Sequence, residues 1–168
     1  SFMPESVSPL AIGACTMAIG GILLFAVSAR ASLLTIRDAA SRRWLLIGAI
    51  GVVVYPLAFY SSMDLAGVAI GNVVSLGTGP VFAALLEWIV ERRGLSRLWL
   101  VCTAGAILGV VLLALAGHPG RDSSNESVVL GVALGLAAGF AYALYTYASS
   151  RAIRLGNAPR GVMGGMFG

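Results

Sequence analysis

Uncharged polar side chains recur every three residues in a hydrophobic segment that extends from about Leu65 to Val90. They are Asn72, Ser75 and Thr78. Positions three apart on a helix are neighbours, so these side chains would form a polar line on one face. Because such groups donate and accept hydrogen bonds without carrying charge, we predict that they contact a small neutral or zwitterionic solute.

The same segment contains the sequence Gly77-Thr78-Gly79-Pro80 near its middle. Pro80 cannot donate a backbone hydrogen bond to the carbonyl oxygen of Leu76, and the two glycines loosen the turn. Helices interrupted by glycine and proline at mid-membrane are typical of transporter substrate sites. We therefore predict a helix break at Gly77, Gly79 and Pro80 that lines a cavity. The alternative is a kink repaired by packing.

Three tyrosines lie near the middle of two other hydrophobic segments. Tyr142 and Tyr145 are three residues apart, and Tyr55 precedes Pro56. A phenol hydroxyl in the middle of a hydrophobic segment needs a hydrogen-bond partner or water. We predict that Tyr55, Tyr142 and Tyr145 belong to the same solute-binding site, with a purely structural packing role as the alternative.

Glu87 is the carboxylate that lies deepest within the hydrophobic segments, four residues inside Glu91. An ionisable group within a membrane helix suggests a functional site, so coupling of transport to an ion is one hypothesis for Glu87. The other is that its side chain extends to the cytoplasmic interface and pairs with an arginine there.

The composition excludes a soluble globular domain. Hydrophobic residues make up 58% of the 168 residues, charged residues only 11%, and 22 residues are glycine. Soluble domains carry about 25% charged residues. The single histidine, His118, and the cysteines Cys15 and Cys102 have no metal-ligand or redox spacing. We expect no metal, no cofactor and no enzymatic activity, because no nucleophile–histidine pair or buried carboxylate pair is present.

Five stretches contain no Asp, Glu, Lys or Arg, and each reaches the length of about 20 helical residues that a bilayer core requires. They cover residues 6–29, 44–63, 65–86, 98–120 and 127–150. The sequence therefore predicts an all-α, polytopic helical membrane protein with five transmembrane helices. A sixth begins near Gly161 and is truncated at Gly168, so we expect the chain to be a fragment of a longer protein.

The eleven basic residues are all arginines, and ten of them fall in alternate connections between these stretches. Basic residues favour cytoplasmic connections. We therefore expect the arginine-rich connections around residues 30–43, 92–97 and 151–160 to be cytoplasmic, in a bacterial inner membrane. Topology accounts for the positive charge, so we expect no nucleic acid as a partner. The expected partners are the bilayer and a small-molecule solute.

Small residues recur every four positions along several of these stretches. Such stripes let helix backbones approach closely in lipid. We predict close helix packing at Gly67, Gly71, Ser75 and Gly79, at Gly131, Gly135, Gly139 and Ala143, and at Gly105 and Gly109.

Several of these segments resemble one known family. They are Tyr55-Pro56-Leu57-Ala58-Phe59-Tyr60, Gly79-Pro80-Val81-Phe82-Ala83-Ala84-Leu85-Leu86 and Ala141-Tyr142-Ala143-Leu144-Tyr145. In order and spacing they are similar to the EamA-type branch of the drug/metabolite transporter superfamily. The resemblance covers nearly the whole chain from Pro9 onward.

This resemblance implies ten helices in two five-helix repeats of inverted orientation. Residues 1–117 would then be the remainder of the first repeat, with four helices, and residues 118–126 an external loop. Residues 127–168 would begin the second repeat. The helix before Ser1 and the rest of the second repeat would be missing from the chain, unless a homo-oligomer takes their place.

The resemblance also implies a secondary transporter, which exports a small neutral or zwitterionic metabolite such as an amino acid or drug by alternating access. A non-transporting membrane scaffold or assembly protein is the alternative. A small dimeric multidrug antiporter is less well supported, because such proteins depend on a buried glutamate in their first helix and residues 6–29 contain no acid.

Overall fold

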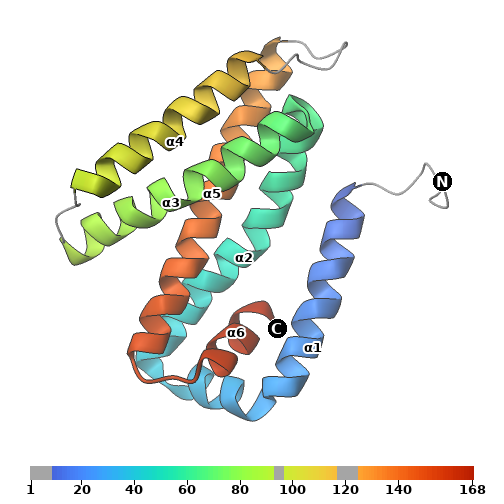
Figure 1. Ribbon diagram of the computed structural model, residues 1–168. Coiled ribbons are helices and arrows are strands. Elements are labelled where there is room, and N and C mark those ends of the chain that lie inside the picture. Colours follow the sequence, from blue (N-terminus) through green and yellow to red (C-terminus); the bar gives the residue numbers. More distant parts are fainter. Residues whose placement is uncertain (1–8, 93–96, 117–124) are drawn as a thin grey trace.

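The computed structural model describes residues 9–92, 97–116 and 125–168, all of them in helices or short turns between helices. The helices are α1 (Pro9–Arg37), α2 (Ala39–Ala66), α3 (Val68–Glu91), α4 (Arg97–Ala116), α5 (Asn125–Arg154) and α6 (Pro159–Phe167). α1, α2 and α5 run steeply in the view of Figure 1, α3 and α4 lie side by side at an oblique angle to them, and α6 lies between α1 and α2. The all-α prediction is confirmed. Residues 118–124 of the predicted external loop lie outside the described residues.

Four of these helices are long and apolar enough to cross a membrane, namely Cys15–Arg37, Ala39–Ala66, Val68–Glu91 and Glu126–Arg154. This confirms a polytopic helical membrane protein. The predicted stretch 98–120 overlaps α4, in which the described apolar part is the shorter Trp99–Gly109. A fifth crossing there, and with it the count of five, stays a prediction.

The helices extend beyond the charge-free stretches from which they were predicted. The first does not end near residue 29 but continues past Arg30 to Arg37. A charge does not end a helix in a membrane, since a long arginine side chain can reach the interface while its backbone stays helical. The predicted stretch that began at Leu65 is also corrected, because α2 continues through Ala66 and α3 begins at Val68.

A single residue joins α2 to α3. Gly67 has a φ of 87° and a ψ of 151°, a backbone conformation that side chains with a Cβ rarely adopt. A Cβ on Gly71, one turn into α3, would lie 2.7 Å from the backbone nitrogen of Met63. The two helices therefore form a tight hairpin whose closeness depends on both glycines.

The glycine stripe of α5 lies where this helix meets α2 and α3. A Cβ on Gly131 would lie 2.6 Å from the backbone nitrogen of Ala66, and one on Gly135 would lie 3.0 Å from Val74. The hydroxyl of Ser62 donates a hydrogen bond of 2.7 Å to the carbonyl oxygen of Gly131. The stripe on α4 differs, because no described atom lies within 4 Å of a Cβ on Gly105 or Gly109.

A second small-residue contact joins α1 to α6, and sequence reasoning missed it. Three hydroxyl-bearing side chains of α1 are buried, Ser28, Ser32 and Thr35. Opposite them a Cβ on Gly161 would lie 2.9 Å from the Thr35 hydroxyl, and one on Gly164 would overlap the hydroxyls of Ser28 and Ser32. These hydroxyls are satisfied within α1, since those of Ser28 and Ser32 lie 3.1 Å apart and that of Thr35 donates to the carbonyl oxygen of Ala31 at 2.9 Å.

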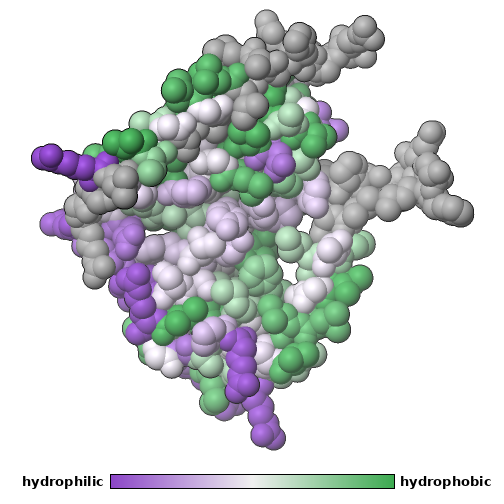
Figure 2. All heavy atoms as spheres, in the orientation of Figure 1, coloured by the Kyte–Doolittle hydropathy of each residue, from purple (hydrophilic) through white to green (hydrophobic). Residues whose placement is uncertain are grey.

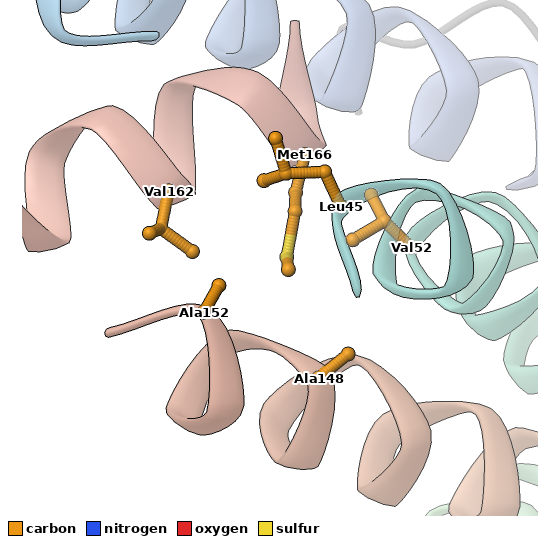
Figure 3. Packing of buried hydrophobic residues seen from close by; sticks show 6 residues of the cluster. All are labelled: Leu45, Val52, Ala148, Ala152, Val162 and Met166. Carbon is orange, nitrogen blue, oxygen red and sulfur yellow. The ribbon is translucent and has the colours of Figure 1, made fainter. Parts of the chain in front are cut away.

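The hydrophobic core connects three helices (Figure 3). It contains Leu45 and Val52 of α2, Ala148 and Ala152 of α5, and Val162 and Met166 of α6. A smaller buried cluster contains Ala66, Ile70 and Val74. Many other large apolar side chains face outward, and Val27 is 88% exposed. Figure 2 shows hydrophobic side chains over α1 and hydrophilic ones along the lower and left edges. This distribution suits a protein whose solvent is lipid, with small residues between helices and large ones outside.

Candidate solute-binding site

The structure brings the three predicted tyrosines together, and we call Tyr55, Tyr142 and Tyr145 the tyrosine cluster. The ring centroids of Tyr142 and Tyr145, three residues apart on α5, are 5.3 Å from each other. Tyr55 on the facing α2 lies 5.7 Å from Tyr142 and 6.2 Å from Tyr145. These distances are typical of interacting aromatic rings. The cluster therefore spans the contact between α2 and α5.

Two further rings extend the tyrosine cluster. Phe59, one turn along α2, stacks on Tyr55 at 5.5 Å, and Phe167 of α6 lies edge-on to Tyr145 at 5.9 Å. All three tyrosines are only half-buried. The cluster thus offers ring faces and three hydroxyl groups within the bundle.

Glycines make room for the tyrosine cluster. A Cβ on Gly51 of α2 would lie 2.8 Å from the carbonyl oxygen of Ala141 and 3.1 Å from Cβ of Tyr145. A Cβ on Gly79 of α3 would lie 3.1 Å from Cδ1 of Tyr142. All three distances are shorter than ordinary contacts of a Cβ atom, so larger residues would push the rings away.

The predicted polar line on α3 divides between two environments. Ser75 is fully buried, and its hydroxyl has no hydrogen-bond partner among the described residues. Thr78 is half-buried and donates a hydrogen bond of 2.7 Å to the carbonyl oxygen of Val74. Asn72 is exposed. Three residues turn a helix by about 300°, so the line drifts around the axis and only its later part faces α5.

Ser75 and Thr78 lie against Gly139 of α5. A Cβ at Gly139 would overlap the Thr78 hydroxyl and lie 2.9 Å from the carbonyl oxygen of Ser75. Gly139 is one turn before Tyr142. The structure therefore places two residues of the polar line next to the tyrosine cluster and leaves Asn72 apart from it.

The predicted helix break is wrong as a break in secondary structure. α3 is helical from Val68 to Glu91, with Pro80 inside it. A proline removes one backbone hydrogen bond, and neighbouring helices can stabilise the helix despite that loss. A role of Gly77, Gly79 and Pro80 in lining a solute cavity stays a prediction.

Among the residues that the structure describes, an ion-pair network forms at Glu91 and not at Glu87. We call Glu91, Tyr147, Arg151 and Arg154 the Glu91 cluster. The carboxylate accepts hydrogen bonds from Arg154 at 2.9 Å, from Arg151 at 3.3 Å and from the Tyr147 hydroxyl at 3.4 Å. The Glu91 side chain is 9% exposed. The network ties the end of α3 to the end of α5.

Glu87 lies one turn away and lines a hollow of about 360 Å³ between α3, α4 and α5. Within the described part of the chain its carboxylate forms no ion pair or hydrogen bond. The hypothesis that Glu87 pairs with an arginine is therefore not met among the described residues. Its role in ion coupling stays a prediction.

A polar network at the α1–α2 turn was not predicted either. Asp38 caps α2 by accepting hydrogen bonds from the Ser41 backbone at 3.0 Å and from the Ser41 hydroxyl at 2.5 Å. The Asn157 amide donates to the same hydroxyl at 2.6 Å. The hydrogen bond from the Ser41 side chain lowers the pKa of the Asp38 carboxyl below its usual value. An acid four residues before the Arg42–Arg43 pair, opposite an asparagine in another connection, is too weak a pattern to reveal this.

Comparison with known proteins gives two matches. The model of the EamA-like transporter family matches residues 1–115. The uncharacterized transporter YwfM of Bacillus subtilis (strain 168) is 33% identical over 152 residues, which cover 87% of this chain and 47% of that protein. The chain therefore spans about half the length of this curated relative. No solved structure matches.

Proposed function

This chain belongs to the EamA-like transporter family, and on that premise we propose that it forms part of a secondary exporter of the bacterial inner membrane. It is part of a membrane transporter, as family and apolar helices agree. Its solute is a small neutral or zwitterionic metabolite, such as an amino acid or drug, moved by alternating access. The arginine-rich connections face the cytoplasm.

The tyrosine cluster carries the proposal. If the second repeat begins after the external loop, Tyr55 belongs to the first repeat and Tyr142 and Tyr145 to the second. Substrate sites of transporters built from inverted repeats lie at the repeat interface near the bilayer midplane. Rings that meet across that interface separate when the repeats rock, which would expose their hydroxyls to a solute.

The polar atoms near the tyrosine cluster support an uncharged or zwitterionic solute. The Thr78 hydroxyl and the backbone carbonyl of Ser75 lie against Gly139, one turn before Tyr142 on α5. The hydroxyl of Ser75 is buried and has no partner in the described residues. A buried hydroxyl without a partner costs free energy unless a ligand or water satisfies it. We propose that the solute supplies this hydrogen bond in one state of the transport cycle.

Export from cells tests the proposal. The complete gene that contains this chain is deleted and overexpressed, and metabolites in the medium are compared by untargeted mass spectrometry. We expect at least one compound to rise with expression and fall on deletion. No such compound, with the protein verified in the membrane, would favour a non-transporting scaffold.

Two variants then test the site. We expect Tyr142→Phe and Thr78→Val each to lower export about fivefold, the equivalent of one hydrogen bond of about 1 kcal/mol. Tyr60→Phe and Thr103→Val remove the same groups outside the tyrosine cluster and should leave export unchanged. Wild-type export from both site variants at equal protein levels would remove these residues from the site.

A further inference from the structure

The hollow between α3, α4 and α5 contains one group of each charge. Glu87 of α3 and Arg154 of α5 both line it, together with Ala83, Ala84, Thr146 and Ser150. Glu87 and Arg154 do not approach within the 4.0 Å of an ion pair, although they border the same space. Its volume of about 360 Å³ is within the range of small-molecule sites, roughly 300–1,000 Å³.

The carboxylate of Glu87 needs a partner. It sits inside a membrane-spanning helix and is partly buried, yet it forms no hydrogen bond or ion pair within the described ranges. A carboxylate in such a position is costly unless a cation or a set of donors neutralises it. The cation that lines the same hollow, Arg154, donates a hydrogen bond to Glu91 through one nitrogen, Nη1. A guanidinium has five N–H donors, so Arg154 keeps donors for a second carboxylate.

The hydroxyls in the hollow are arranged as acceptors. The Ser150 hydroxyl donates to the carbonyl oxygen of Tyr147 at 2.8 Å, and the Thr146 hydroxyl donates to that of Tyr142 at 2.9 Å. Each has then used its only hydrogen and keeps oxygen lone pairs. Acceptors beside a carboxylate suit an ammonium group, while Arg154 suits a carboxylate.

We propose that this hollow binds the zwitterion of an aliphatic α-amino acid. Its ammonium group binds Glu87, its carboxylate binds Arg154, and its side chain packs on Ala83 and Ala84. This inference rests on the proposed function and deepens it by assigning a loading site at the arginine-rich end.

The hollow adjoins the tyrosine cluster, which gives the loading site a place in the transport path. Pro80 lines the hollow, and the preceding Gly79 packs against the ring of Tyr142. From Glu87 to Pro80 is about 10 Å along α3. An amino acid bound at Glu87 is therefore about two helical turns from the wall that separates it from the tyrosines.

Three related probes distinguish a zwitterion site from a site for one charge. L-Leucine carries both charges, leucine methyl ester only the positive one, and N-acetyl-leucine only the negative one. Binding is measured by calorimetry on the complete protein in lipid nanodiscs. We expect leucine to bind at least about tenfold more tightly than either analogue, because each analogue loses one charge-assisted interaction.

Substitution of each charge should abolish one preference only. Glu87→Gln should weaken the binding of leucine about tenfold and leave the binding of N-acetyl-leucine unchanged. Arg154→Gln should weaken the binding of leucine about tenfold and leave the binding of leucine methyl ester unchanged. Arg151→Gln is the matched control, since it also removes an ion pair with Glu91 but does not line the hollow. Glu126→Gln, at the other end of α5, controls for the loss of a carboxylate.

Several results would overturn the loading site. These are equal binding of the three probes, no binding of leucine, or unchanged leucine binding by Glu87→Gln. The unfolding temperature of Glu87→Gln should match the wild type, so that a folding defect is recognised. Leucine binding with the expected preferences but no export from cells would overturn the proposed function and keep the loading site. Export from cells that does not change when Glu87 or Arg154 is substituted would overturn the loading site and keep the proposed function.

Discussion

At the centre of the bundle, α5 meets α2 and α3 through glycines and hydroxyls, whereas at its arginine-rich end the same helix is held by charge. Gly135 and Gly139 bring the backbones together at the centre, and Gly131 does the same nearer the start of α5, against Ala66 at the end of α2. At the end, Arg151 and Arg154 bind the nearly buried carboxylate of Glu91. One helix thus uses shape in one half and electrostatics in the other.

The depth of each region in the membrane explains the difference. A charge is expensive in the hydrocarbon core and cheap near the headgroups, where arginine can reach water. Packing between small residues works at any depth because it depends on contact alone. Changes at the centre should therefore act through fit, and changes at the end through charge and ionic strength.

The largest effect is expected from filling the central contact. Gly139→Leu should destabilise the protein by about 3 kcal/mol or more, because the new side chain would overlap the Thr78 hydroxyl and the backbone of Ser75. Chemical unfolding in detergent measures the loss. Gly105→Leu is the matched control on α4, where no described atom lies within 4 Å of a Cβ. Equal losses for the two variants would contradict close packing at Gly139.

A smaller effect is expected from the charged end. Glu91→Gln should cost about 1–2 kcal/mol, since the carboxylate is nearly buried while its arginine partners are 35% and 50% exposed. The difference in the free energy of unfolding between Glu91→Gln and wild type should become smaller as salt is added. Gly139→Leu should show no such salt dependence, which separates the two regions directly. A salt-independent loss for Glu91→Gln would mean that packing, not charge, holds this end.

Two buried serines, one on α2 and one on α3, sharpen the comparison. Ser62→Ala should cost about 1 kcal/mol, because it removes the hydrogen bond to the carbonyl oxygen of Gly131. Ser75→Ala should be nearly neutral for stability, because the Ser75 hydroxyl has no partner within the described residues. Thermal unfolding of both variants checks the pair. A cost for Ser75→Ala equal to that of Ser62→Ala would show that Ser75 is satisfied in the resting protein.

The smallest effect concerns Asp38 and depends on pH. Its carboxyl has a lowered pKa in the folded protein, so the ionised form contributes stability above the usual value of 3.8. That contribution is lost as the pH falls through the folded pKa. The unfolding temperature of Asp38→Ala should lie below wild type at pH 6 and approach it near pH 3. Asp64→Ala, at the other end of α2, is the control, and a pH-independent difference for Asp38→Ala would contradict the linkage.

Charge and hydropathy were sufficient to predict the helices but not which of their faces meet. Arginine spacing and apolar length follow from the bilayer itself, so a single sequence reveals them. The contact of Ser28 and Ser32 with Gly164 joins residues more than a hundred positions apart, and nothing local in either segment identifies the partner. Likewise Glu91, not the deeper Glu87, forms the ion pairs, because the position of α5 decides which carboxylate the arginines reach.

The candidate site was predicted in part for a similar reason. Tyr142 and Tyr145 share a face by helical spacing alone, and Tyr55, predicted for the same site, lies beside them across the contact with α2. Asn72 failed to join them because a three-residue repeat drifts around the helix. The break at Pro80 is absent because packing can compensate for one missing hydrogen bond.

The one-residue connection at Gly67 also constrains how the protein is made. With nothing but Gly67 between Ala66 and Val68, neither α2 nor α3 can leave the translocation machinery and settle in lipid while the other waits behind. We therefore expect α2 and α3 to be inserted together as a helical hairpin. A one-residue connection also leaves no loop that a protease could cleave or an antibody could bind at that end of the hairpin.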